Sequence, residues 1–191
     1  MRLFLLCVAV ILSCACTCKA DAQEAESPAK HVPERYGLGV VSGNTYSPNN
    51  DIEFALLSGF AQFRHDAIWP YFAPDALHFK VECSAGATTA PRTRSIASAG
   101  LILLYYLGDF GDGRVRPYIE GGCHVIYGDF QVPGEGLRVN FNPQGGIGAE
   151  FQITENQSFY LGFRIQHISN ADMDPENAGI NSLSITVGRL F

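Results

Sequence analysis

The chain has 191 residues, a formal net charge of −6, and many glycine and aromatic residues, with 20 Gly, 13 Phe and 8 Tyr. Its length predicts one domain, and an acidic sequence without a basic tract argues against nucleic-acid binding. Beyond the N-terminal residues there is no apolar run of 18, which excludes a transmembrane helix. These features predict either a soluble β protein or a β-barrel.

Residues 1–22 have the pattern of a secretory signal peptide. Arg2 gives the positive start, Leu3 to Ala15 is a short apolar segment, and Ala-Asp-Ala at 20–22 is a small-x-small cleavage site. Removal after Ala22 leaves a mature chain of about 169 residues out of 191. Three nearby cysteines leave a lipoprotein signal open, although the residues before each form a poor lipobox. Residues 23–34 are predicted to be a polar, disordered leader.

Residues 35–191 are predicted to form one all-β domain with eight strands. Turn-rich segments containing Gly, Pro, Asn and Asp separate the strands, and most runs are longer than the five or six residues usual in soluble sheets. The predicted strands are Tyr36 to Val41 (the shortest), Glu53 to Arg64, Leu77 to Thr88, Ile96 to Leu107, Val115 to Tyr127, Arg138 to Ile153, Asn156 to Ser169 and Asn181 to Phe191.

Side chains alternate between apolar and polar along these segments, so each strand has one apolar face. Charges of both signs recur on the other face, at Lys80, Glu82, Arg116, Glu120, Glu150 and Arg164. A soluble sandwich or lipocalin would turn the apolar face inward, whereas a membrane barrel turns it to lipid and pairs the charges in a filled interior. Strand length, the export signal and a final strand that ends on Phe191 favour an eight-stranded antiparallel transmembrane β-barrel.

Only two cysteines, Cys83 and Cys123, remain after the signal peptide. Export permits a disulfide between them, but both positions also suit small apolar residues on strands. No Cys or His spacing indicates a metal site.

Strand alternation places His167 and Ser169 on one face, together with Phe163 and Ile165. With both chain ends on the periplasmic side, this strand runs outward, and Asn181 opens the next strand across a polar loop. We therefore expect His167, Ser169 and Asn181 to face lipid at the outer rim, where polar groups indicate a functional site. A serine beside a histidine base is the pattern of an esterase nucleophile, although the spacing alone also fits two unrelated polar residues.

The segment HISNADMDPENAGIN, residues 167–181, resembles the signature of the PagL-type lipid A 3-O-deacylases, a family of eight-stranded outer-membrane acyloxyacyl hydrolases. His167, Ser169, Asn170, Asn177 and Gly179 match its pattern position by position. The resemblance implies a serine esterase that removes the 3-O-linked hydroxyacyl chain of lipid A, with Ser169 as nucleophile and His167 as base. It implies Asn170 and Asn177 as oxyanion or supporting residues, and no metal or cofactor.

One position departs from the family pattern, because Asn181 stands where its best-known members have a glutamate. An amide can hold the histidine tautomer but cannot stabilise an imidazolium by charge. Asp172, Asp174 and Glu176 of the loop are alternatives, although none lies on the predicted strand face. A non-catalytic barrel, structural or adhesive, is the alternative function.

The same resemblance sets the expected location and partners. We expect a multi-pass barrel of a Gram-negative-type cell outer membrane that contacts lipopolysaccharide and membrane lipid. Terminal Phe191 resembles the signal that is read by the barrel assembly machinery. A homodimer is left open, and nucleic acid is not an expected partner.

Overall fold

The computed structural model describes residues 32–49, 51–68, 73–130, 132–155 and 157–191. The predicted signal peptide and nearly all of the predicted leader lie outside these residues. Among the residues described, no helix combines the length and apolar character needed to cross a membrane.

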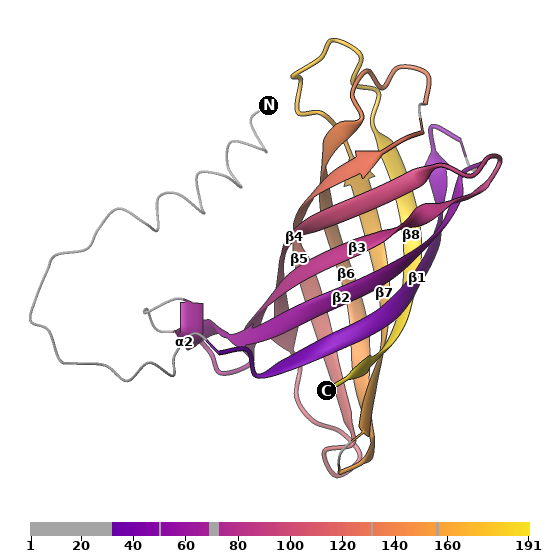
Figure 1. The fold of residues 1–191 in the computed structure, drawn as a ribbon. Coiled ribbons are helices and arrows are strands. Elements are labelled where there is room, and N and C mark those ends of the chain that lie inside the picture. Colours follow the sequence, from indigo (N-terminus) through magenta and orange to yellow (C-terminus); the bar gives the residue numbers. More distant parts are fainter. Residues whose placement is uncertain (1–31, 50, 69–72, 131, 156) are drawn as a thin grey trace, which may run out of the picture.

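Eight antiparallel strands close into one barrel, in which each strand pairs with its sequence neighbours and β1 also pairs with β8. A short helix, α2 (His65–Ile68), follows β2 (Figure 1). The strands are β1 (Arg35–Ser47), β2 (Glu53–Arg64), β3 (Leu77–Ala90), β4 (Ser95–Tyr106), β5 (Val115–Gly128), β6 (Val139–Thr154), β7 (Gln157–Ile168) and β8 (Ile180–Leu190). This confirms the predicted fold class.

The first strand is longer than predicted, because β1 continues to Ser47 instead of ending at Val41. Its second half has a turn-like composition, but it hydrogen-bonds to β2 on one side and to β8 on the other. Closure of the barrel therefore overrides local preference. Gly43 is required there, since a Cβ at this position would lie 2.4 Å from the Leu183 carbonyl oxygen.

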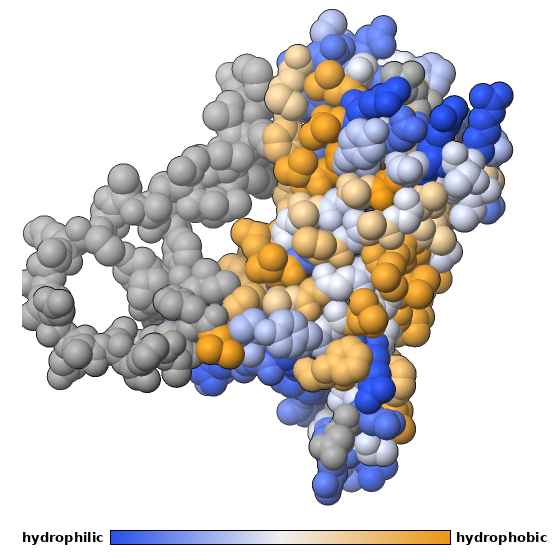
Figure 2. All heavy atoms as spheres, viewed as in Figure 1, coloured by the Kyte–Doolittle hydropathy of each residue, from blue (hydrophilic) through white to orange (hydrophobic). Residues whose placement is uncertain are grey.

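Apolar side chains cover the outside of the barrel wall, and charged ones lie inside it. Leu57, Leu101, Ile147 and Ile165 are each at least 58% exposed, whereas Lys80 is 2% exposed. Figure 2 shows hydrophobic residues over the wall and hydrophilic residues at both ends. A lipocalin-like soluble barrel would show the reverse distribution, so the surface is that of a membrane-spanning barrel.

The middle of the interior is a network of paired charges. The Arg164 guanidinium contacts Glu82 Oε1 at 2.5 Å and Oε2 at 2.9 Å, and its Nε donates to Glu120 Oε1 at 2.6 Å. Lys80 Nζ lies 3.3 Å from Glu120 Oε2. These contacts join three strands, β3, β5 and β7, as predicted for a narrow filled barrel.

Nearer one end, Arg35 Nη1 lies 2.8 Å from Glu150 Oε2, within the interior. Arg116 is on the inward side of β5, as predicted, with its guanidinium 4.1 Å from the ring centroid of buried Tyr106, but unlike the charges deeper in the barrel it is 37% exposed and pairs with Asp109 at 3.0 Å. Its place next to the start of β5 explains the difference, since the barrel is open to solvent at its ends.

The segments that join β1 to β2, β3 to β4, β5 to β6 and β7 to β8 lie at one end of the barrel, here called the upper rim (Figure 1). Beneath this rim the interior becomes apolar. Ile168 of β7 and Ile180 of β8 are part of this core, and they are 7% and 2% exposed. The apolar core holds the upper ends of β7 and β8 together.

Cys83 and Cys123 both face outward and form no disulfide. They lie on β3 and β5, which are separated by β4. The interpretation of both as small residues on strands agrees with these positions.

Candidate active site

The polar pair at the upper rim comes from the facing ends of two neighbouring strands, the second-to-last residue of β7 and the second residue of β8. His167 of β7 is directly opposite Asn181 of β8, and both side chains lie on the outer face of the barrel. His167 Nδ1 is 2.7 Å from Asn181 Oδ1. Because a carbonyl oxygen only accepts hydrogen bonds, Nδ1 carries the proton and Nε2 is left as the basic nitrogen.

Gly179 makes room for the His167 ring. It has a φ of +76°, and a Cβ built on it would lie 2.8 Å from His167 Cε1. Both the backbone conformation and the close approach therefore require glycine. The ring rests directly on the backbone of the segment that leads into β8.

Ser169 follows the last residue of β7 and extends its pairing with β6. Its N–H donates to the Phe141 carbonyl at 3.0 Å, and its carbonyl accepts from the Phe141 N–H at 2.9 Å. Strand alternation puts its half-buried side chain on the same outer face as His167. Within the part of the chain that the structure describes, the Ser169 hydroxyl forms no hydrogen bond with His167, although the two residues are two positions apart on the same outer face.

The loop between β7 and β8 is fixed by its own amides. Asn170 is fully buried, its N–H donates to Asn177 Oδ1 at 2.9 Å, and its Nδ2 donates to the Glu176 carbonyl at 2.9 Å. Asn177 Nδ2 in turn donates to Asp172 Oδ1 at 2.9 Å. Asn170 and Asn177 thus act as structural supports of the site in this arrangement.

None of the loop acids considered from the sequence contacts His167. Asp172 is bonded to Asn177, Asp174 accepts from the Glu176 N–H at 2.9 Å, and the Glu176 side chain is exposed. Among the described residues, Asn181 is the side chain that is hydrogen-bonded to the imidazole.

A carboxylate that sequence reasoning missed lies beneath the site. Glu135, in the segment between β5 and β6, is only 6% exposed, and its Oε2 accepts the Gly179 N–H at 3.2 Å. Burial raises the pKa of the Glu135 carboxyl above its usual value, while the Gly179 N–H and the nearby His167 side chain act in the opposite direction. No local sequence signal marks Glu135, because 44 residues separate it from Gly179.

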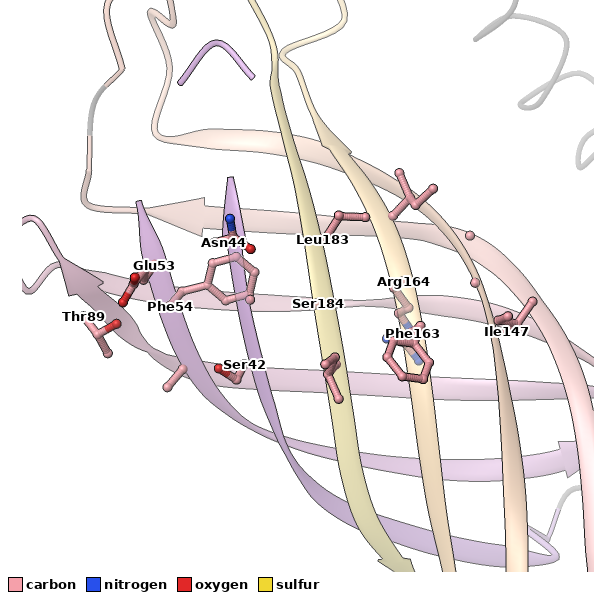
Figure 3. A pocket seen from close by; sticks show the side chains of 16 residues that line it. Ser42, Asn44, Glu53, Phe54, Thr89, Ile147, Phe163, Arg164, Leu183 and Ser184 are labelled. Atoms are coloured by element: carbon pink, nitrogen blue, oxygen red, sulfur yellow. The ribbon is translucent and has the colours of Figure 1, made fainter. Parts of the chain in front are cut away.

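An apolar groove of about 1030 Å³ lies on the outer wall next to the pair. Figure 3 shows residues that line it, among them Phe163, Ile147 and Leu183. Ile165 and Leu183, which line it, form the next outward pair below His167 and Asn181. Phe163 and Ile147 continue the groove down the wall, while its other side includes Asn44 and more polar residues. Successive outward residues of a strand lie about 7 Å apart, so the groove and the imidazole are adjacent.

The barrel is similar to three solved structures. Neisserial surface protein A is 13% identical with a TM-score of 0.58, over 82% of this chain and 94% of that chain. The outer membrane enzyme PagL is 21% identical with a TM-score of 0.56, over 80% and 97%. The N-terminal β-barrel domain of Pseudomonas aeruginosa OprF is 14% identical with a TM-score of 0.50, over 83% and 98%. At these identities the likeness shows the fold.

Fold and surface together define an eight-stranded barrel of the outer-membrane class, with a polar pair on its apolar outer face. A family model described as lipid A 3-O-deacylase (PagL) matches residues 57–189, which are 133 of the 191 residues. The chain therefore belongs to the lipid A 3-O-deacylase (PagL) family, which confirms the resemblance seen in residues 167–181. No curated protein matches the chain.

Proposed function

We propose that this chain is an active esterase that removes the 3-O-linked hydroxyacyl chain of lipid A in the outer leaflet. Membership of the deacylase family supports the proposal, and one structural observation carries it. The His167 ring is held at 2.7 Å by Asn181 on the outer face, directly above an apolar groove. A base placed there can act on an ester whose acyl chain stays in the membrane.

In the proposed first step, Ser169 Oγ attacks the ester carbonyl carbon, and its proton moves to His167 Nε2. The tetrahedral intermediate collapses as the sugar 3-oxygen leaves and takes that proton, which leaves an acyl group on Ser169. Water then attacks the acyl-serine with His167 again as base. The products are a free hydroxy fatty acid and lipid A with a 3-hydroxyl group.

Asn181 performs part of the work of a triad acid in this scheme. Its carbonyl oxygen holds the Nδ1 proton and so keeps Nε2 free for Ser169. A neutral amide adds no charge to stabilise the imidazolium. We therefore expect activity below that of an otherwise equal site with a carboxylate at this position.

The groove determines where the acyl chain lies. Phe163, Ile165 and Leu183 form a continuous apolar wall below the imidazole, so the chain to be removed would lie along β7 and β8 without leaving lipid. Asn170 and Asn177 hold the rim loop, whose backbone N–H groups would face the oxyanion.

Lipid A mass spectrometry tests the proposal directly. Wild type reconstituted with lipopolysaccharide should produce lipid A lighter by one hydroxyacyl chain, and Ser169→Ala should leave it intact while the barrel stays folded. Asn181→Glu should raise the rate. A folded wild type that releases no fatty acid would contradict the proposal and favour the non-catalytic barrel.

A further inference from the structure

Glu135 has the environment of a residue with an electrostatic role. Its side chain is 6% exposed, only one of its oxygens has a partner, and Oε1 accepts no hydrogen bond within the described chain. A buried carboxylate that is not fully paired costs free energy of folding.

The position of Glu135 indicates where that charge acts. Gly179 lies next to both groups, since its N–H bonds to Glu135 Oε2 and a Cβ built on it would lie 2.8 Å from His167 Cε1. The segment that carries Glu135 is fastened to the β7–β8 loop, because Ala178 N–H donates to the Gly134 carbonyl at 2.7 Å and Gly136 N–H donates to the Glu176 carbonyl at 2.9 Å. Glu135 is therefore fixed beneath the ring.

We propose that Glu135 supplies the negative charge for the His167 imidazolium that Asn181 cannot supply. The inference rests on the proposed esterase function. The two tasks of a triad acid are then divided between two residues: Asn181 orients the imidazole through Nδ1, and Glu135 stabilises its charged form from below. Glu135 is a positioning residue, since it does not touch the substrate.

Other acids of the rim fit this role less well. Asp174 is in the β7–β8 loop, but its Oδ1 already accepts a hydrogen bond from the Glu176 N–H. Asp172 is exposed and bonded to Asn177. A charge acts more strongly where water is excluded, which favours the buried Glu135 over both. His167 and Asp174 are the charged groups that act on Glu135, and they shift the pKa of its carboxyl in opposite directions.

The substitution Glu135→Gln removes the charge and keeps an oxygen that can accept the Gly179 N–H. We expect kcat for lipid A deacylation to fall about tenfold, which is the effect of roughly 1.4 kcal/mol, with KM within about twofold. Asn181→Glu in the Glu135→Gln background should restore kcat, because it places a carboxylate directly on Nδ1. The matched control is Glu176→Gln, which removes an exposed acid of the neighbouring loop and should leave kcat unchanged.

A second readout separates this inference from the choice of substrate. The rate at which a fluorophosphonate probe labels Ser169 reports the nucleophile and base without lipid A, and it should follow the same order of variants. A Glu135→Gln variant with wild-type kcat and labelling rate overturns the inference. So does a slow variant that Asn181→Glu fails to restore, since that shows a purely structural role.

The two possible failures are distinguishable. If wild type is labelled but leaves lipid A intact, the proposed substrate is wrong while the role of Glu135 is still measured by labelling. A wild type that is neither labelled nor active overturns both proposals. Folding of each variant is checked by the shift in gel mobility between heated and unheated samples.

Discussion

Strand β7 carries two polar centres only three residues apart, one inside the barrel and one outside. Arg164 faces inward and is bound by Glu82 and Glu120, with all three side chains at most 8% exposed. His167 faces outward and has one hydrogen-bonded partner on the neighbouring strand, Asn181. The inner centre has all of its charged groups paired and joins three strands, whereas at the outer one Nε2 has no hydrogen-bond partner among the residues that the structure describes. Full pairing of the inner charges stabilises the fold, whereas a ring nitrogen without a hydrogen-bond partner can accept a proton in catalysis.

The largest expected effect is the loss of deacylation activity when the outer centre is altered. Replacing His167 or Ser169 with Ala should each reduce deacylation by more than about a thousandfold, because the two groups act as a unit. The double variant should be no worse than either single one. Lipid A mass spectrometry and single-turnover kinetics measure this. An additive loss in the double variant would show that the two residues work separately.

The next largest effect is expected on the stability of the barrel, when the inner centre is altered. Arg164→Met leaves Glu82 buried without its bidentate partner and should lower the free energy of unfolding by about 3–5 kcal/mol. Arg116→Met breaks an exposed pair with Asp109, so its expected loss is at most about 1 kcal/mol. Urea unfolding in detergent, followed by tryptophan fluorescence and gel mobility, measures both. Equal losses would remove the distinction between buried and exposed pairs.

A smaller effect is expected for the residue that orients the base. Asn181→Ala should reduce kcat about a hundredfold, since His167 loses the acceptor that fixes its tautomer, and stability should change little. Ser182→Ala tests the neighbouring inward position of β8 and should leave kcat unchanged. If Asn181→Ala keeps wild-type kcat, another group orients the ring.

The groove should give the smallest effect, because an acyl chain that leaves it enters lipid of similar polarity. Phe163→Ala is expected to lower kcat/KM about threefold. Phe159→Ala is the matched control, since it removes the same side chain from the same strand and outer face but away from the groove. Equal effects of both variants would show that the groove does not guide the acyl chain.

Sequence reasoning reached the outer centre because its residues are close along the chain. His167, Ser169 and Asn181 lie within 15 residues, and strand alternation fixes the face on which each side chain lies. The same alternation identified the inward charges, including Arg164. The sequence is sufficient to predict which face a side chain lies on, because alternation along a strand depends only on neighbouring residues.

Other features depended on contacts between distant segments. The second half of β1 has the composition of a turn, and its pairing with β2 on one side and β8 on the other makes it a strand. Glu135 lies in a turn segment, and its place beneath His167 follows from the meeting of two loops at the upper rim. The face of Arg116 was predicted correctly but its exposure was not, because alternation does not indicate how far a residue lies from the end of the barrel.

The outward direction of the His167 ring has a consequence for kinetics. A substrate that reaches this site moves sideways in the plane of the bilayer and never crosses bulk water. Saturation then depends on the mole fraction of substrate among the surrounding lipids, so diluting the membrane with inert lipid should slow turnover even when the total amount of substrate in the tube is constant. The encounter is two-dimensional because the fold places its basic nitrogen on the outside of the wall.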